Sequence, residues 1–273
     1  MRSIFCLILL LLASGCATAN VGNATSGNDR KGGAVQQVEA NKLPEAARLA
    51  RLRKGINLSN WFAQGESGNR EHVKKFISTT DIQEIKHLGF THVRLPIDPS
   101  YFLDEKNPSQ LNPNYLAELD RAIALITSQD LAVIIDLHHP GDGFRKRLAH
   151  DDRFVFAVAT LWRSLANRYS TYSPNLIFFE VLNEPAFTYM FDDKQIGIKR
   201  WVSVQERLVA AIRQSAPQHT LIVNDADFGK VEYLRQMSLL ADKNVIYSIH
   251  FYEPMVFTHQ GADWLQHFQY LQL

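Results

Sequence analysis

The feature that most constrains the fold of this chain is a regular alternation of short apolar runs with helical patterns. Six runs have the length and composition of buried strands, and residues with helical periodicity fill the segments between them. The predicted strands are 54–61, 91–97, 132–138, 176–182, 220–224 and 245–252. Near-continuous apolar strands are typical of a parallel sheet covered by helices, so the sequence predicts an α/β fold.

The segments between the strands carry helix signals of their own. Thr80 and Gln83 have the spacing of a capping box, and Gly89 follows the apolar stripe that begins there. Asn112 and Pro113 make a cap with a proline in the first turn. Further helical stripes begin at Phe154, Trp201 and Val231. The sequence is therefore a series of βα units.

Two architectures are built from such units: an open doubly wound sheet and a closed (β/α)8 barrel. A nucleotide-binding doubly wound sheet carries a glycine-rich loop after a strand, and Gly141-Asp142-Gly143 lacks the remaining spacing. Polar residues instead follow the second, third, fourth and sixth strands, and in a barrel these strand ends meet at one mouth. The sequence therefore predicts a TIM-type (β/α)8 barrel that is incomplete, with about six βα units present and strands seven and eight missing.

The N-terminus has the features of a targeting segment. Arg2 precedes an apolar stretch, 4–13, that is too short to span a bilayer. The stretch leads into Ala13-Ser14-Gly15-Cys16, which is similar to the bacterial lipobox, so Cys16 is the predicted site of lipid attachment. Plain secretory cleavage after a small residue is the alternative. We expect the protein either at the bacterial cell envelope, held to the membrane only by a lipid anchor, or secreted.

Composition divides the chain into three predicted regions: a signal peptide at 1–16, a flexible linker at 17–42 and a barrel domain at 43–273. Cys6 would leave with the signal, so the mature chain is predicted to form no disulfide. Lys and Arg number 29 and Asp and Glu 28, a net charge of +1. This balance provides no electrostatic footprint for nucleic acid, and it favours a neutral partner such as a sugar.

The strongest functional signal is the triplet Asn183-Glu184-Pro185, directly after the fourth predicted strand. A carboxylate at the end of a buried strand is held rigidly and still reaches solvent, which suits proton transfer to a bound substrate. Polar side chains also stand at the ends of three other strands: Arg94, His138, His139, His250 and Tyr252. We expect them to surround Glu184 at the mouth of the barrel.

Five motifs, in order along the chain, resemble glycoside hydrolase family 5, the cellulase-like retaining glycosidases. The resemblance runs from about residue 55 to residue 252. The motifs are Gly55-Ile56-Asn57-Leu58, Val93-Arg94-Leu95-Pro96, Asp136-Leu137-His138-His139, Val181-Leu182-Asn183-Glu184-Pro185 and His250-Phe251-Tyr252. The resemblance implies endoglucanase-like hydrolysis of a β-linked polysaccharide such as β-glucan, with no cofactor and no metal.

The resemblance also implies roles for the strand-end residues. Glu184 is the implied acid/base, and Asn183 the implied ligand of the sugar 2-hydroxyl. Arg94, His138, His250 and Tyr252 are implied to shape the subsite around the nucleophile; His139 is a further candidate for substrate binding, although neighbours on a strand point to opposite sides. A retaining enzyme needs a second carboxylate about 5 Å from the first, and we expect that neighbour to raise the pKa of Glu184.

The chain departs from the family pattern at the nucleophile. In the family this residue is a Glu at the end of the seventh strand, whereas the sequence ends at Leu273, and Asp263 falls in the start of a predicted sixth helix. No nucleophile can be named. The resulting hypothesis is a C-terminally truncated enzyme whose nucleophile lies beyond Leu273, and the activity of the encoded chain stays open.

Other interpretations of the same residues remain. A non-catalytic carbohydrate-binding barrel would keep the sugar contacts without a nucleophile. A metal-dependent barrel hydrolase would use Asp136 and His138 with Asp225 or Asp227, since His and Asp suit zinc or manganese. Trp61 is either a platform for a sugar ring or a packing residue at the end of the first strand.

Overall fold

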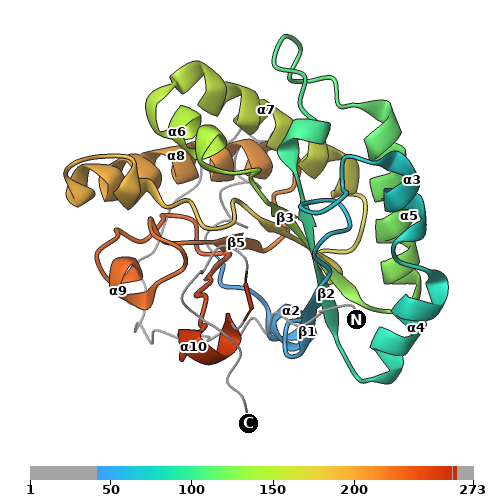
Figure 1. Ribbon diagram of the computed structural model, residues 1–273. Coiled ribbons are helices and arrows are strands. Elements are labelled where there is room, and N and C mark those ends of the chain that lie inside the picture. Colours follow the sequence, from blue (N-terminus) through green and yellow to red (C-terminus); the bar gives the residue numbers. More distant parts are fainter. Residues whose placement is uncertain (1–41, 260, 263–273) are drawn as a thin grey trace, which may run out of the picture.

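The structure is a computed structural model that describes residues 42–259, 261 and 262. One parallel sheet runs in sequence order through β1 Gly55–Asn57, β2 His92–Ile97, β3 Ala132–Leu137, β4 Ile177–Glu180, β5 Leu221–Val223 and β6 Val245–Tyr247 (Figure 1). The predicted α/β fold with six parallel strands is confirmed. The predicted signal peptide with Cys16, nearly all of the predicted linker, and Asp263 lie outside the described residues.

Helices follow the strands and cover the outer face of the curved sheet (Figure 1). Two short 3₁₀ turns, η1 Pro99–Tyr101 and η2 Phe187–Tyr189, come directly after β2 and β4. In chain order the helices are α2 Ala46–Arg51, α3 Arg70–Lys75, α4 Thr79–His87, α5 Pro113–Ser128, α6 Asp142–His150, α7 Asp152–Tyr169, α8 Lys194–Ser215, α9 Val231–Leu234 and α10 Met255–Thr258. No helix of the described residues is both long and apolar enough to cross a bilayer.

The helix ends follow the sequence signals with one correction. Asn112 caps α5 by accepting from the backbone N–H of Asn114, and Gly89 follows α4 with a φ of +78°, both as predicted. The capping box of α4, however, joins Ser78 and Asp81, not Thr80 and Gln83. A carboxylate acceptor forms a stronger bond to the N-cap N–H than an amide does, so the earlier pair sets the helix start.

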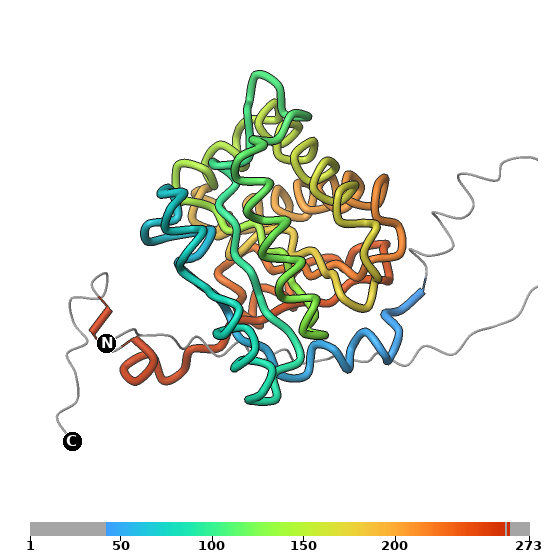
Figure 2. The backbone as a smooth tube through the Cα atoms, turned by 90° about the vertical axis from the view of Figure 1, so that its right-hand side faces the viewer, coloured from blue at the N-terminus to red at the C-terminus, as the bar shows by residue number. Residues whose placement is uncertain are grey.

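The first and last strands are shorter than predicted. β1 ends at Asn57, and the chain then turns at Asn60, whose φ is +61°. β6 ends at Tyr247, so His250 and Tyr252 lie in the following loop. The predicted strands were too long because the apolar residues continue past the last residue that pairs with a neighbouring strand. Figure 2 shows the segment around α10 projecting from the body of the protein, and its side chains are largely exposed.

Two apolar layers follow from the alternation of side chains along the strands. Residues such as Val133 and Ile135 point outward and join the large core beneath the helices. Ile134 points inward and joins a smaller cluster on the inner face of the sheet, which Leu52, next to α2, also joins. The segment around α2 thus packs inside the sheet at the amino ends of the strands. The carboxyl ends of the strands are left open for a site.

Candidate active site

A cleft of about 510 Å³ lies at the carboxyl ends of the strands. Its walls come from the segments after β1, β2, β3, β4 and β5, which is the usual place of a site in this architecture. The lining residues are Gln64, Gly65, Ser67, Asp98, Tyr101, His138, His139, Pro140, Gly141, Arg145, Asn183, Glu184 and Phe228. The structure therefore brings four sequence-predicted residues to one cleft: His138, His139, Asn183 and Glu184.

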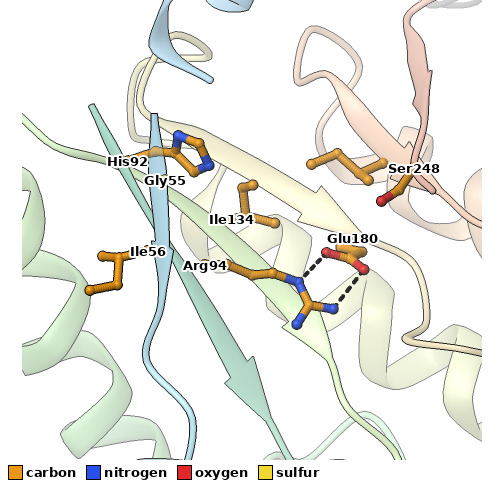
Figure 3. Close-up of a pocket in the computed structure, with 8 residues that line it drawn as sticks. Gly55, Ile56, His92, Arg94, Ile134, Glu180 and Ser248 are labelled. Carbon is orange, nitrogen blue, oxygen red and sulfur yellow. Dashed lines mark hydrogen bonds and ion pairs between the residues drawn. The ribbon is translucent and has the colours of Figure 1, made fainter. Parts of the chain in front are cut away.

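Arg94 lies below the cleft and ties the strands together. Its Nε and Nη2 donate to the two carboxylate oxygens of Glu180 at 2.7 and 2.8 Å (Figure 3). Nη2 also lies 2.9 Å from Asp136 Oδ2. Nη2 donates to Asn183 Oδ1 at 2.9 Å, and Nη1 donates to Asn57 Oδ1 at 3.0 Å. Predicted as a subsite residue, Arg94 is also the centre of a buried ion-pair network.

The sheet register explains why this network needs a cation. Asp136 and Glu180 are direct partners across β3 and β4, so two carboxylates face each other in the buried interior. Like charges in such positions repel, and the guanidinium compensates them. Burial raises the pKa of Asp136, although Arg94 opposes this. Burial would also raise the pKa of Glu180, but the charge and hydrogen bonds of Arg94 lower it below its ordinary value.

His138 is oriented from both sides. Its Nδ1 donates to Asp136 Oδ2 at 2.9 Å, and its Nε2, 3.2 Å from the amide nitrogen of Gln64, accepts from that group. The ring is therefore fixed between the strand interior and the loop after β1. A ring held in this way presents a rigid wall to a ligand in the cleft.

Glu184 occupies a bend after β4 and reaches the cleft with a quarter of its side chain, 25%, exposed. Its φ is +42°, in the left-handed region that non-glycine residues seldom adopt and that is often found at functional sites. His250, from the loop after β6, places Nδ1 2.6 Å from Glu184 Oε1. His250 itself is almost fully buried, so it reaches the cleft only through Glu184.

The pKa of Glu184 differs from the sequence expectation. Burial would raise it, but the hydrogen bond from His250 and the nearby His138 and Arg94 outweigh burial and lower it below its ordinary value. The expected rise depended on a second carboxylate beside Glu184, and the groups that face Glu184 here are donors and cations. A lowered pKa favours the ionised form of Glu184 at neutral pH.

His139 does not turn its ring nitrogens to the cleft. Nε2 donates to the backbone oxygen of Glu184 at 3.3 Å, and Nδ1 accepts from the backbone N–H of Gly141 at 3.1 Å. Arg145 of α6 contacts the same Glu184 oxygen, with Nη1 at 3.4 Å. His139 lines the cleft as predicted, but its polar atoms hold the backbone.

Two other candidates lie elsewhere. Tyr252 is half-buried on the segment that leads into α10, with its ring 5.0 Å from that of His259, and it is not among the cleft-lining residues. Trp61 is fully buried and its Nε1 donates to the Val73 oxygen at 2.7 Å. Of the two interpretations of Trp61, the structure supports packing.

Several residues of the site were not nominated from the sequence. Asn57 stood within a family motif, and Glu180 was visible as a charge inside an apolar run. Asn224, which donates to Glu180 Oε1 at 3.2 Å, follows β5, and this position at a strand end was its only signal. Gln64 and Arg145 lie in a loop and a helix with no local signal of function.

The residues invoked for a metal site do not assemble into one. Asp136 is engaged with Arg94 and His138, whereas Asp225 accepts from the backbone N–H of Asp227. Within residues 42–259, 261 and 262, no three His, Cys, Asp or Glu side chains lie close enough to hold a metal ion together.

Known proteins share both the sequence pattern and the fold. The chain is 31% identical over 221 residues to cellodextrinase A of Ruminococcus flavefaciens, covering 77% of this chain and 61% of that protein. It is 30% identical over 221 residues to endoglucanase C of Acetivibrio thermocellus, covering 79% and 62%. The chain thus spans about three fifths of the length of these relatives.

A solved structure has the same architecture. Thermotoga maritima Cel5A, crystallised in a mutant form with cellobiose, superimposes with a TM-score of 0.70 at 28% identity, covering 83% of this chain and 73% of that one. The sequence model described as cellulase (glycosyl hydrolase family 5) matches residues 54–271. Since that match includes all six strands and every cleft residue described above, the chain belongs to glycosyl hydrolase family 5.

Proposed function

We propose that this protein is a β-glucan hydrolase of the endoglucanase type that acts with retention, and that Glu184 is its acid/base. The observation that carries the proposal is the placement of the Glu184 carboxyl group. It is partly exposed in the cleft, held at 2.6 Å by His250, and adjoins Asn183, which Arg94 orients. A proton-transfer group with a fixed direction is one of the two groups that glycosidic cleavage with retention requires.

Each residue has a distinct task in the proposed reaction. In the first half, a carboxylate nucleophile bonds to the anomeric carbon as the bond to the leaving oxygen breaks, and the Glu184 carboxyl group gives its proton to that oxygen. In the second half, Glu184 takes a proton from the water that attacks the anomeric carbon, and the nucleophile leaves as a carboxylate. Because its carbonyl oxygen accepts from Arg94, Asn183 presents its NH₂ group as a donor for the sugar 2-hydroxyl. No described carboxylate is assigned as the nucleophile.

The resting charge of Glu184 sets a condition on the first step. The carboxylate that accepts from His250 must gain a proton before it can act as an acid. A sugar in the cleft excludes water, and an ionised nucleophile adds a negative charge; both changes raise the pKa of a carboxyl group. Substrate binding therefore prepares the acid.

The names of the relatives support a proposal for the substrate class. Two of them are named cellodextrinase and endoglucanase, and the solved structure holds cellobiose. We assign β-1,4-linked glucan as the substrate, entering a cleft whose walls come from five of the segments that follow the strands.

Two substrates test this proposal. The protein, expressed from its complete gene so that the nucleophile is included, is incubated with two substrates: 2,4-dinitrophenyl β-cellobioside, whose leaving group needs no acid, and cellotetraose, whose leaving group does. We expect release of dinitrophenol from the first substrate and cleavage of the second. ¹H NMR should show that the β-anomer of the new reducing end forms before the α-anomer. Release of the α-anomer first would contradict the retaining mechanism.

A second candidate function is a non-catalytic carbohydrate-binding barrel. The observation that favours it concerns Asp98, which is the only carboxyl group besides Glu184 among the described residues that line the cleft. Asp98 Oδ1 accepts from both the N–H and the hydroxyl of Ser100 and so caps η1, which gives Asp98 a structural task. Calorimetric binding of cellotetraose, with no release of dinitrophenol, would assign this function.

We also propose that Cys16 is lipid-modified and anchors the protein at the cell envelope, as the lipobox-like segment suggests. Mass spectrometry of the protein from bacterial membranes tests this. Cys16→Ala should abolish the lipid mass, and the matched control Cys6→Ala should retain it. Unmodified Cys16 in the wild-type protein would contradict the proposal.

A further inference from the structure

We infer that His139 is a positioning residue that holds the backbone of Glu184, so that the carboxyl group meets His250 and the substrate at a fixed angle. The inference rests on the acid/base role of Glu184 proposed above. It gives His139 a task different from sugar binding. Glu184 would then be held both at its backbone oxygen and at its carboxyl group.

The first step is the state of the His139 ring. Gly141 N–H occupies Nδ1 as a donor, so Nδ1 is the unprotonated nitrogen and the proton lies on Nε2. Nε2 points to the backbone oxygen of Glu184 at 3.3 Å. Both ring nitrogens are therefore used by the main chain of the two loops that follow β3 and β4.

The second step is the backbone that this ring holds. Glu184 has a φ of +42° and Ala186 a φ of +52°, so two non-glycine residues in a row of three are left-handed. Such a conformation persists only when its surroundings stabilise it. The Glu184 oxygen supplies the contact, since His139 and Arg145 Nη1 both donate to it. Arg145 is in turn held by Asp142 and by the ring of Phe228, 5.3 Å from its guanidinium carbon.

The third step joins the two ends of Glu184. The backbone oxygen is fixed from the β3 side and the carboxyl group from the β6 side, where His250 Nδ1 lies at 2.6 Å. If the peptide unit rotates, the Cα–Cβ bond changes direction and the carboxyl group leaves His250. The hydrogen bond from His139 thereby controls the distance between His250 Nδ1 and the Glu184 carboxyl group, and this contact lowers the pKa of Glu184.

The charge of His139 fits this task. Burial, together with the charge of Arg145, lowers the pKa of His139 to about 4. The ring consequently stays neutral with one donor at neutral pH. A neutral clamp orients the acid without adding a full charge that would compete with its protonation.

The experiment compares three variants of the full chain. His139→Ala removes the donor. His139→Gln restores one, because the glutamine amide nitrogen can occupy the place of Nε2. His150→Ala is the matched control, since His150 Nε2 also contacts a backbone oxygen after β4, that of Met190 at 3.1 Å, but does not contact Glu184. Thermal unfolding of each variant shows that it is folded.

The main measurement is the titration of the Glu184 carboxyl carbon by ¹³C NMR, with Glu184→Gln to assign the signal. In His139→Ala we expect the midpoint to rise by half a pH unit or more, because His250 loses its hold on the carboxylate. His139→Gln should return toward the wild-type midpoint, and His150→Ala should equal it. An unchanged midpoint in His139→Ala, or an equal rise in His150→Ala, would overturn the inference.

Kinetics separate this inference from the proposed function. In His139→Ala, kcat for cellotetraose should fall at least tenfold, whereas release from 2,4-dinitrophenyl β-cellobioside should change less than threefold. An equal fall on both substrates would count against positioning of the acid. If the wild-type chain cleaves neither substrate, the hydrolase proposal fails, and the NMR comparison still decides the role of His139.

Discussion

Nδ1 of His250 donates to Oε1 of Glu184 across 2.6 Å, and this bond joins the loops after β6 and β4. β5 lies between these strands in the sheet, so the contact depends on the curvature of three neighbouring strands. Burial alone would raise the pKa of Glu184, and the bond from His250 is the largest of the influences that lower it. The protonation state of the proposed acid is thus set by residues that are distant in sequence.

Glu184→Gln should abolish proton transfer while keeping the shape of the side chain. We expect kcat/KM for cellotetraose to fall by roughly 10²–10⁴, the usual contribution of general acid–base catalysis. The first release of dinitrophenol from the activated cellobioside should persist, and azide, which needs no base, should speed later turnovers. Glu206→Gln, an exposed position on α8, is the control. Equal rates of Glu184→Gln and wild type on cellotetraose would exclude Glu184 as the acid.

Arg94→Met should destabilise the fold. It leaves Asp136 and Glu180 facing each other without a cation, and breaking a buried charge network in this way costs about 3–5 kcal/mol. Urea unfolding at pH 7 measures this. Adding Glu180→Met should recover part of the loss, since one uncompensated carboxylate disappears. If the double variant instead lost as much unfolding free energy as Arg94→Met and Glu180→Met lose separately when added together, the two charges would not be coupled.

Gly55→Ala should also be destabilising, because an added Cβ would lie 2.0 Å from Nε2 of the buried His92 (Figure 3). We expect a loss of about 1–3 kcal/mol in the free energy of unfolding, as for overpacked cores. His92→Ser in the same chain should relieve it. Gly143→Ala is the control: nothing lies within 4 Å of its added Cβ on helix α6, so it should be neutral or stabilising by up to about 1 kcal/mol. Equal effects at both glycines would contradict the steric argument.

Stability should fall as the pH drops from about 6.5 to about 4. Burial lowers the pKa values of His92, His139 and His219 from 6.5 to about 4, so in this range the unfolded chain binds protons that the folded chain does not. The stabilisation is complete above pH 6.5 and is lost toward pH 4, with on the order of 3 kcal/mol for each ring. Urea unfolding at several pH values measures the slope.

A single substitution checks the origin of that slope. His219→Leu removes a titrating ring whose centroid lies 5.5 Å from that of Phe179, and an apolar side chain keeps that contact. The slope between pH 6.5 and 4 should become shallower, because one of the three rings no longer takes up a proton on unfolding. A slope as steep as in the wild-type protein would show that His219 is not one of the sources.

The strand order and the place of the cleft were predictable because their signals are local. Each apolar run marked a strand, and Glu184 and His138 stood where two runs ended. The partners of Arg94 were not predictable in the same way. Glu180 became one of them because the register of β3 and β4 sets it opposite Asp136, and no local pattern encodes that register.

The residues by themselves determined the alternation of strands and helices, the helix caps and the presence of a carboxyl group at a strand end, since these depend on near neighbours in the chain. Only the tertiary structure decided that His139 turns both nitrogens to the backbone, that Trp61 is buried, and that donors surround Glu184. The reason is physical: hydrogen-bond partners and pKa shifts depend on distances between segments far apart in sequence, and folding sets those distances.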